Sequence, residues 1–142
     1  PTTEGGYVGS EMYTSGLDQA KTKIHADFPG RVLTHWRRLS NATSNGAASG
    51  SVWIDSDIEL MNEHMVYGSN VAANSARSLN VGIEKSQLPL FRLRHDLIGA
   101  RHTWWLRDVA SATDFALVNL TGFANRGNAS LALGVRPVFS IF

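Results

Sequence analysis

The stretch WWLRD at residues 104–108 and the stretch GVRPVF at residues 134–139 decide the fold expected for the C-terminal third of the chain. Tryptophan side chains bury large apolar areas when their N–H groups find partners. Arg107 and Arg136 each present a planar fork of donors that fits backbone carbonyls or a carboxylate. The glycine and proline of the second stretch suit a bend and a strand start. We therefore expect both stretches to belong to the core and its scaffold.

Short apolar segments surround these two stretches, and Gly- and Asn-rich connections separate them. This pattern predicts strands over residues 88–93, 102–109, 115–120 and 134–142. It argues against a helical continuation in this part of the chain.

The N-terminal part has a helical pattern instead. Apolar residues recur at three- and four-residue steps from Ser10 to the Pro29-Gly30 break, namely Leu17, Ala20, Ile24 and Phe28. A strand is expected over residues 31–39. Residues 40–51 are small and polar, which predicts a flexible loop.

A second helix is expected near Asp57, after a short strand at residues 52–54. Ser56 followed by Glu59 is a capping-box signature. The inward face of this helix would hold Ile58, Met61 and Met65. Its solvated face would hold Glu59 and Glu63, which could alternatively form a carboxylate pair. Residues 68–80 are predicted to be a second long loop, of the kind that is functional or disordered.

Helices mainly in the first half and strands mainly in the second half indicate an α+β fold. A length of 142 residues with 43% hydrophobic residues is typical of one domain, spanning residues 1–142. The first residue is a proline, so we expect the chain to be the C-terminal part of a longer protein.

Composition excludes several functions. A formal net charge of +1 gives no electrostatic case for nucleic acid, and no apolar run is long enough to span a membrane. The absence of cysteine excludes disulfides, zinc-thiolate sites and cysteine nucleophiles. The five histidines form no metal-binding spacing, and no nucleophile elbow, phosphate loop or dinucleotide fingerprint occurs. We therefore expect no catalytic residues, no metal and no cofactor.

The two C-terminal stretches resemble the end of a phage-associated C-type-lectin-like family. Residues 52–68 and 86–91 are also similar to its pattern, so the resemblance covers most of the chain from about Thr34. This family is related in fold to the formylglycine-generating (sulfatase-modifying) domain and to the phage major tropism determinant. The catalytic cysteines of the former and the EPN and WND motifs of calcium-dependent lectins are absent. The resemblance therefore implies a non-catalytic binding domain without a calcium-bridged sugar site.

Many members of this family are variable proteins of diversity-generating retroelements, which mutate the adenines of Asn-type codons. Such codons cannot encode Lys, Glu, Gln, Met or Trp. Residues 108–142 contain none of these five types, although the chain has seventeen such residues. At the overall rate about four would be expected there. A strand-rich segment also avoids Lys and Glu.

The resemblance implies a scaffold of Trp105, Leu106, Arg107, Phe115, Val118, Gly122 and residues 134–137. The positions between them would point outward and form a variable binding face in residues 111–133. The candidate ligand-binding residues are Ser111, Thr113, Asp114, Leu117, Asn119, Leu120, Thr121, Phe123, Asn125, Arg126, Asn128, Leu131 and Leu133. Exposed together, the leucines and Phe123 would mark an interaction site, whereas the alternative places these leucines in an ordinary core.

These observations lead to a receptor- or ligand-binding domain on a phage virion (tail fibre or capsid) or a bacterial surface. Its partner would be a host-surface protein or glycan, and the domain could form a homo-oligomer. The alternatives are a decoration or assembly domain that contacts other virion subunits, and, more weakly, a hydrolase or other enzyme with a deep pocket.

Overall fold

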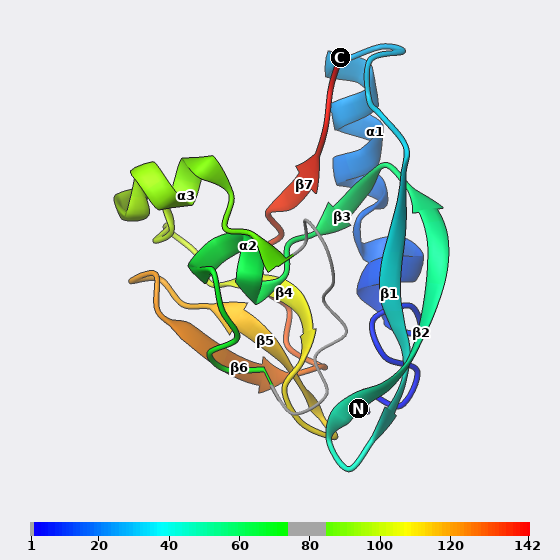
Figure 1. The fold of residues 1–142 in the computed structure, drawn as a ribbon, viewed down its shortest axis with the longest axis vertical. Coiled ribbons are helices and arrows are strands. Elements are labelled where there is room, and N and C mark those ends of the chain that lie inside the picture. Colours follow the sequence, from blue (N-terminus) through cyan, green and yellow to red (C-terminus); the bar gives the residue numbers. More distant parts are fainter. Residues whose placement is uncertain (1, 74–84) are drawn as a thin grey trace.

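The computed structural model describes residues 2–73 and 85–142. In this part of the chain, helices and mainly antiparallel strands are mixed (Figure 1). The predicted α+β class is therefore confirmed as a mixture of helices and mainly antiparallel strands. The expected division between the halves is wrong, because the two longest strands, β1 (His35–Ser44) and β2 (Ala47–Ser56), lie in the N-terminal half. Their sequence is too polar to show the apolar alternation that marks a half-buried strand.

The N-terminal segment forms a short π-helix, Met12–Gly16, followed by α1, Asp18–Asp27. A helix ending at Pro29-Gly30 is therefore confirmed, and Gly30 has a left-handed φ of 68°. Leu17 is buried, whereas α1 itself buries no residue fully. The helix thus lies on the surface. The apolar contact of this segment with the core comes mainly from Leu17, in the turn before the helix.

Strands β1 and β2 form a long antiparallel hairpin (Figure 1). The predicted flexible loop at residues 40–51 is wrong, because this segment is the end of β1, the turn and the start of β2. Asn45 and Gly46 have φ of 51° and 72°, so both central turn residues are left-handed. Asn-Gly is the preferred pair for such a turn, whose twist matches that of the strands.

Strand β3, Ile58–Leu60, pairs antiparallel with β7, Pro137–Phe139. The predicted helix start near Asp57 is therefore wrong. The helix begins six residues later as α2, Glu63–Tyr67, where the Asn62 side chain accepts a hydrogen bond from Met65 N at 2.8 Å. The three apolar residues expected to face inward are buried nonetheless: Ile58, Met61 and Met65.

The segment after α2 contains two further one-turn elements. Residues 88–93 were expected to be a strand, but Pro89–Leu93 is helix α3 and His95–Leu97 is the 3-10 helix η4. Proline at the first helical position fits a helix start, because its missing N–H needs no partner there. Of the predicted loop at residues 68–80, residues 68–73 are without regular structure, and residues 74–80 lie outside the described residues.

The C-terminal third builds a three-stranded antiparallel sheet in the order β4-β5-β6. Its strands are β4 (Trp104–Val109), β5 (Asp114–Val118) and β6 (Ala124–Asn128), of which β6 was not expected. An apolar cluster lies on each side of the central strand: Ala116 and Val118 belong to one, and Phe115 and Leu117 to the other. The middle of the sheet is thus largely buried on both faces, and the exposed side chains of its described residues lie at its ends and on β6.

Candidate functional site

Five of the expected scaffold residues are buried where the sheet meets the core, whereas Gly122 and residues 134–137 are half-buried. Trp105, Leu106, Arg107, Phe115 and Val118 are all at most 7% exposed. Arg107 reaches across to β3 and donates to the carbonyl of Leu60 at 3.3 Å. Arg136 donates to the carbonyl of Leu97 at 2.8 Å and lies over the Phe91 and Trp104 rings. Both arginines therefore bind backbone carbonyls, as their fork of donors allows.

One group of candidate residues gathers at the β4–β5 turn. Ser111 Oγ accepts hydrogen bonds from the backbone N–H groups of Thr113 and Asp114, at 3.2 and 3.0 Å. Asp114 pairs with Asn128 across the sheet, and its carboxylate lies 4.0 Å from Arg126 Nε. This end of the sheet presents polar side chains in a turn that is fixed by its own hydrogen bonds.

A second group occupies the β5–β6 turn at the opposite end of the sheet. Asn119 Oδ1 accepts three hydrogen bonds, from Thr121 N at 3.0 Å, Thr121 Oγ1 at 2.8 Å and Phe123 N at 3.0 Å. Gly122 has a left-handed φ of 89°, and its carbonyl accepts from Tyr67 Oη at 2.9 Å. This rigid turn exposes 60% of Leu120 and 70% of Phe123. Two large apolar side chains are thus held in solvent on a well-ordered turn.

The edge strand β6 adds two exposed polar side chains, which point to opposite faces of the sheet because they are neighbours in a strand. Asn125 and Arg126 are both exposed, and their cross-strand partners Leu117 and Ala116 are buried. Because β6 has a neighbour on one side only, its other edge is open within the described part of the chain. Arg126 lies in the middle of β6, between the two turns, and pairs with Ala116 of β5.

The prediction that Leu117 points outward is wrong, because this side chain is only 5% exposed. It lies on the central strand of the sheet and packs in the cluster that contains Trp105 and Phe115. Leu133 also packs partly against this cluster. For Leu117 the alternative of an ordinary core holds, whereas Leu133 is half-buried and Leu131 is 49% exposed.

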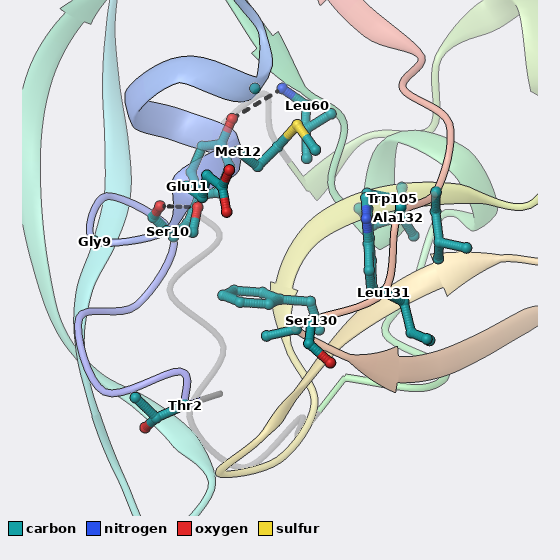
Figure 2. A pocket seen from close by; sticks show the side chains of 16 residues that line it. Thr2, Gly9, Ser10, Glu11, Met12, Leu60, Trp105, Ser130, Leu131 and Ala132 are labelled. Atoms are coloured by element: carbon teal, nitrogen blue, oxygen red, sulfur yellow. Dashed lines mark hydrogen bonds between the residues drawn. The ribbon is translucent and has the colours of Figure 1, made fainter.

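Leu131 and Leu133 line a pocket of about 610 Å³. Its floor is apolar and includes Leu60, Trp105 and Phe115, and its opposite wall comes from the N-terminal segment. Figure 2 shows Gly9, Ser10, Glu11 and Met12 on one side and Ser130, Leu131 and Ala132 on the other. The pocket thus joins two segments that are more than a hundred residues apart in the sequence.

A buried network of hydrogen bonds around Glu59 and Tyr7 fixes the pocket wall. Glu59 was expected on a solvated helix face, but it is fully buried and accepts hydrogen bonds from Tyr7 Oη at 2.7 Å and from Ser56 Oγ. Tyr7 Oη also accepts from Leu60 N at 3.3 Å. Burial, and then the charge of Glu59, raise the pKa of Tyr7 well above its ordinary value. Tyr7 is therefore a permanent donor that ties the N-terminal segment to β3.

Glu63 was also expected on the solvated face and is likewise fully buried. Its carboxylate accepts hydrogen bonds from the backbone N–H groups of Val71, Ala72 and Ala73, at 2.8, 2.7 and 3.0 Å. Its own N–H donates to Asp108 Oδ2 at 2.6 Å. Both glutamates are thus fully buried, and hydrogen-bond donors surround their carboxylates.

Residues 32–142 match the model of a family described as a domain of unknown function, DUF6273. The chain belongs to the DUF6273 family. No curated protein and no solved structure matches it.

The pocket wall formed by residues 2–16 of this DUF6273 protein lies before the matched range. These residues were missed as site residues, because a Gly- and Thr-rich entry segment shows no sign of packing over β4 and β5. Trp36 and Trp53 were also missed as site residues, although the sequence contains a signal for them. A hairpin with its turn at Asn45-Gly46 places both tryptophans on the same face.

Among the described residues of the DUF6273 protein, no group of three or more His, Asp or Glu side chains could hold a metal ion. In the same residues, no helix is long and apolar enough to cross a membrane.

Proposed function

We propose that this DUF6273 protein is a non-catalytic ligand-binding domain whose binding face lies in residues 111–133. The observation that carries this proposal is the exposure of Phe123 (70%) and Leu120 (60%) on a turn fixed by the Asn119 side chain. Solvent-facing apolar groups on a rigid turn cost little entropy when they bind. Arg126, 60% exposed in its side chain, adds a charged anchor on the adjoining strand.

The fold proposed for this face is C-type-lectin-like, of the variable proteins of diversity-generating retroelements. The mixed architecture with mainly antiparallel strands supports it. So does the burial of the WWLR stretch beneath a set of exposed positions. In such a design the scaffold stays constant while the outward side chains change.

The proposed setting is the surface of a phage virion or a bacterial cell, with a host-surface protein or glycan as the ligand. The second candidate is a decoration or assembly domain that contacts other virion subunits. The open edge of β6 favours that candidate, because an unpaired edge is a template for pairing with another chain.

The test uses the labelled domain on arrays of bacterial surface proteins and glycans. The wild type should bind a ligand that the Phe123→Ala and Arg126→Ala variants bind at least tenfold more weakly. Sequencing of sibling genes should place the differences at residues 111–133. Uniform siblings, together with a face that is buried in a homo-oligomer in solution, would instead establish the assembly domain.

A further inference from the structure

Two tryptophans form an exposed platform on the β1–β2 hairpin, far in sequence from the face proposed above. Trp36 is 70% exposed and Trp53 is 51% exposed. Their ring centroids lie 5.4 Å apart, with 47° between the ring planes. The register pairs Trp36 with Asp55 and Arg38 with Trp53, so these four side chains share one face of the hairpin. We call this set the tryptophan platform.

The polar half of the platform consists of one cation and one anion. Arg38 donates through Nε to Ser51 Oγ at 2.8 Å, which fixes the guanidinium beside the indoles. Asp55 is exposed at the other corner. Within the described residues, neither of these charges forms an ion pair. Donors and an acceptor are therefore available next to two aromatic faces.

The spacing of the rings restricts the ligand. At 5.4 Å the two indoles contact each other, so nothing can be sandwiched between them as a cation is in an aromatic cage. A ligand must instead lie across their outer faces. The negative face of an aromatic ring attracts C–H groups that carry partial positive charge. The flat C–H face of a pyranose is such a surface, and its rim of hydroxyls suits a guanidinium and a carboxylate.

Charge and area argue against the other occupants. Arg38 and Asp55 balance each other, so the platform offers no excess positive charge for a polyanion such as nucleic acid. Two indoles bury on the order of 400 Å² at most, about half of what each partner contributes to a stable protein–protein interface. The platform is therefore large enough for two or three sugar rings and too small for a stable dimer.

We propose that the tryptophan platform binds a neutral oligosaccharide, with one sugar ring stacked on each of Trp36 and Trp53. Because the ring planes are inclined by 47°, the two stacked sugars do not lie in one plane, and the centroid distance of 5.4 Å does not select one linkage. The ligand class is therefore a neutral oligosaccharide of pyranose rings, for which β-1,4-linked glucose and N-acetylglucosamine chains are the probes. Arg38 donates to its hydroxyls and Asp55 accepts from them.

The test titrates the full chain with cellohexaose and with chitohexaose, followed by calorimetry and by tryptophan fluorescence. At least one of the two should bind with a dissociation constant of about 1 mM or tighter. Trp36→Ala and Trp53→Ala should each weaken binding by about 3- to 10-fold. Arg38→Gln and Asp55→Asn should weaken it by about 3-fold. Because the ligand is neutral, the affinity should not depend on salt.

Leu93→Ala is the matched control, because Leu93 is 73% exposed, as Trp36 is 70%, but lies on α3 and belongs to neither proposed binding surface. It should leave oligosaccharide binding unchanged. Loss of sugar binding in the tryptophan variants, with binding by residues 111–133 retained, separates this proposal from the proposed function. Trp36→Phe and Trp53→Phe keep a ring at each position and should retain partial affinity in a folded hairpin. Failure of both sugars to bind the wild type overturns the proposal, and so does undiminished binding by the folded double alanine variant. Self-association that is lost in Trp36→Ala, without sugar binding, would assign the platform to a second copy.

Discussion

The hydroxyl of Tyr7 donates a 2.7 Å hydrogen bond to Glu59 Oε2, and both side chains are at most 1% exposed. This bond joins the N-terminal segment to β3, beside the pocket wall. A buried carboxylate depends on such donors, because water cannot replace them. The Tyr7 phenol therefore helps to hold residues 2–16 over the sheet, together with the hydrogen bonds of Thr3 to Ser111 and of Tyr7 N to Ser40.

Replacing Tyr7 by Phe should lower the free energy of unfolding by about 1–3 kcal/mol, because Glu59 loses a donor and Leu60 N–H loses an acceptor. Urea denaturation measures this loss. Tyr13→Phe is the control, since Tyr13 packs edge-on against Tyr7 with centroids 5.3 Å apart but lies half-exposed at the surface. Equal effects of the two substitutions would mean that the ring, and not the hydroxyl, carries the contribution of Tyr7.

Stability should fall at alkaline pH. Burial, and then the charge of Glu59, raise the pKa of Tyr7, while burial, and then the charge of Glu63, raise the pKa of Tyr67. In the unfolded chain tyrosine ionises near pH 10. The stabilisation from these protons is complete below that pH and is lost as the pH rises towards the folded-state values.

The measurement for this second prediction is urea unfolding at a series of pH values from about 9 to 11. Each tyrosine that stays protonated only in the folded state contributes a slope of about 1.4 kcal/mol per pH unit above pH 10. Tyr7→Phe should remove one such contribution. An identical alkaline slope in wild type and variant would show that Tyr7 does not hold its proton.

How far the sequence predicts this protein depends on where the controlling contacts lie. The WWLR strand and its burial could be predicted, because their apolar residues are continuous along the chain. The β1–β2 hairpin was missed because its side chains are small and polar, although the Asn45-Gly46 pair is a direct turn signal. The small, polar side chains of residues 40–51 are typical of a loop and obscure that turn signal.

The two glutamates illustrate what local patterns cannot show. Ser56 and Glu59 fit a capping box, and in the structure their side chains do contact each other, but in a strand instead of a helix start. The partner that buries Glu59 is Tyr7, which lies fifty-two residues earlier. A long-range hydrogen bond of this kind leaves no periodic signal. The exposed positions of the β5–β6 turn were proposed from the family resemblance alone. The burial of Leu117 could not be predicted without knowing that β5 is the central strand of its sheet.

Replacing Glu63 by Gln should release the segment that follows α2. The carboxylate accepts from three consecutive backbone N–H groups, and an amide would turn an NH₂ group towards them. The expected loss of stability is about 2–3 kcal/mol. Hydrogen exchange should speed up at Val71, Ala72 and Ala73, while exposed Glu11→Gln leaves it unchanged. Unaltered exchange at these three amides would contradict the anchoring role of Glu63.

Two substitutions on the β5–β6 hairpin should separate binding from folding. Phe123→Ala should change the melting temperature by no more than about 2 °C, because the ring is 70% exposed. Leu117→Ala should cost about 2–5 kcal/mol, since it opens a cavity between Trp105 and Phe115. Thermal and urea unfolding measure both. A large loss in Phe123→Ala would place this ring in the core and remove it from the proposed binding face.

We expect a substitution of Gly46, in the turn of the β1–β2 hairpin, to displace the β4–β5 turn, because the two turns pack against each other at this glycine. Gly46 and Gly30 have left-handed φ of 72° and 68°, so alanine at either position costs about 1–2 kcal/mol in backbone strain. Only at Gly46 would the added Cβ meet a neighbour, the backbone N of Ala112 at 3.1 Å, whereas nothing lies within 4 Å at Gly30.

Gly46→Ala should therefore cost more stability than Gly30→Ala, by about 1–3 kcal/mol for the forced shift of packed backbone. Chemical denaturation of the two variants gives this difference directly. The displaced backbone is that of Ser111 and Ala112, at one end of the proposed binding face. The Gly46 variant should thus also shift the NMR signals of Thr113 and Asp114, whose N–H groups bond to Ser111 Oγ. Equal costs and unshifted signals would mean that the hairpin turn and the face are independent, and that the hairpin can move without changing what the face presents to a ligand.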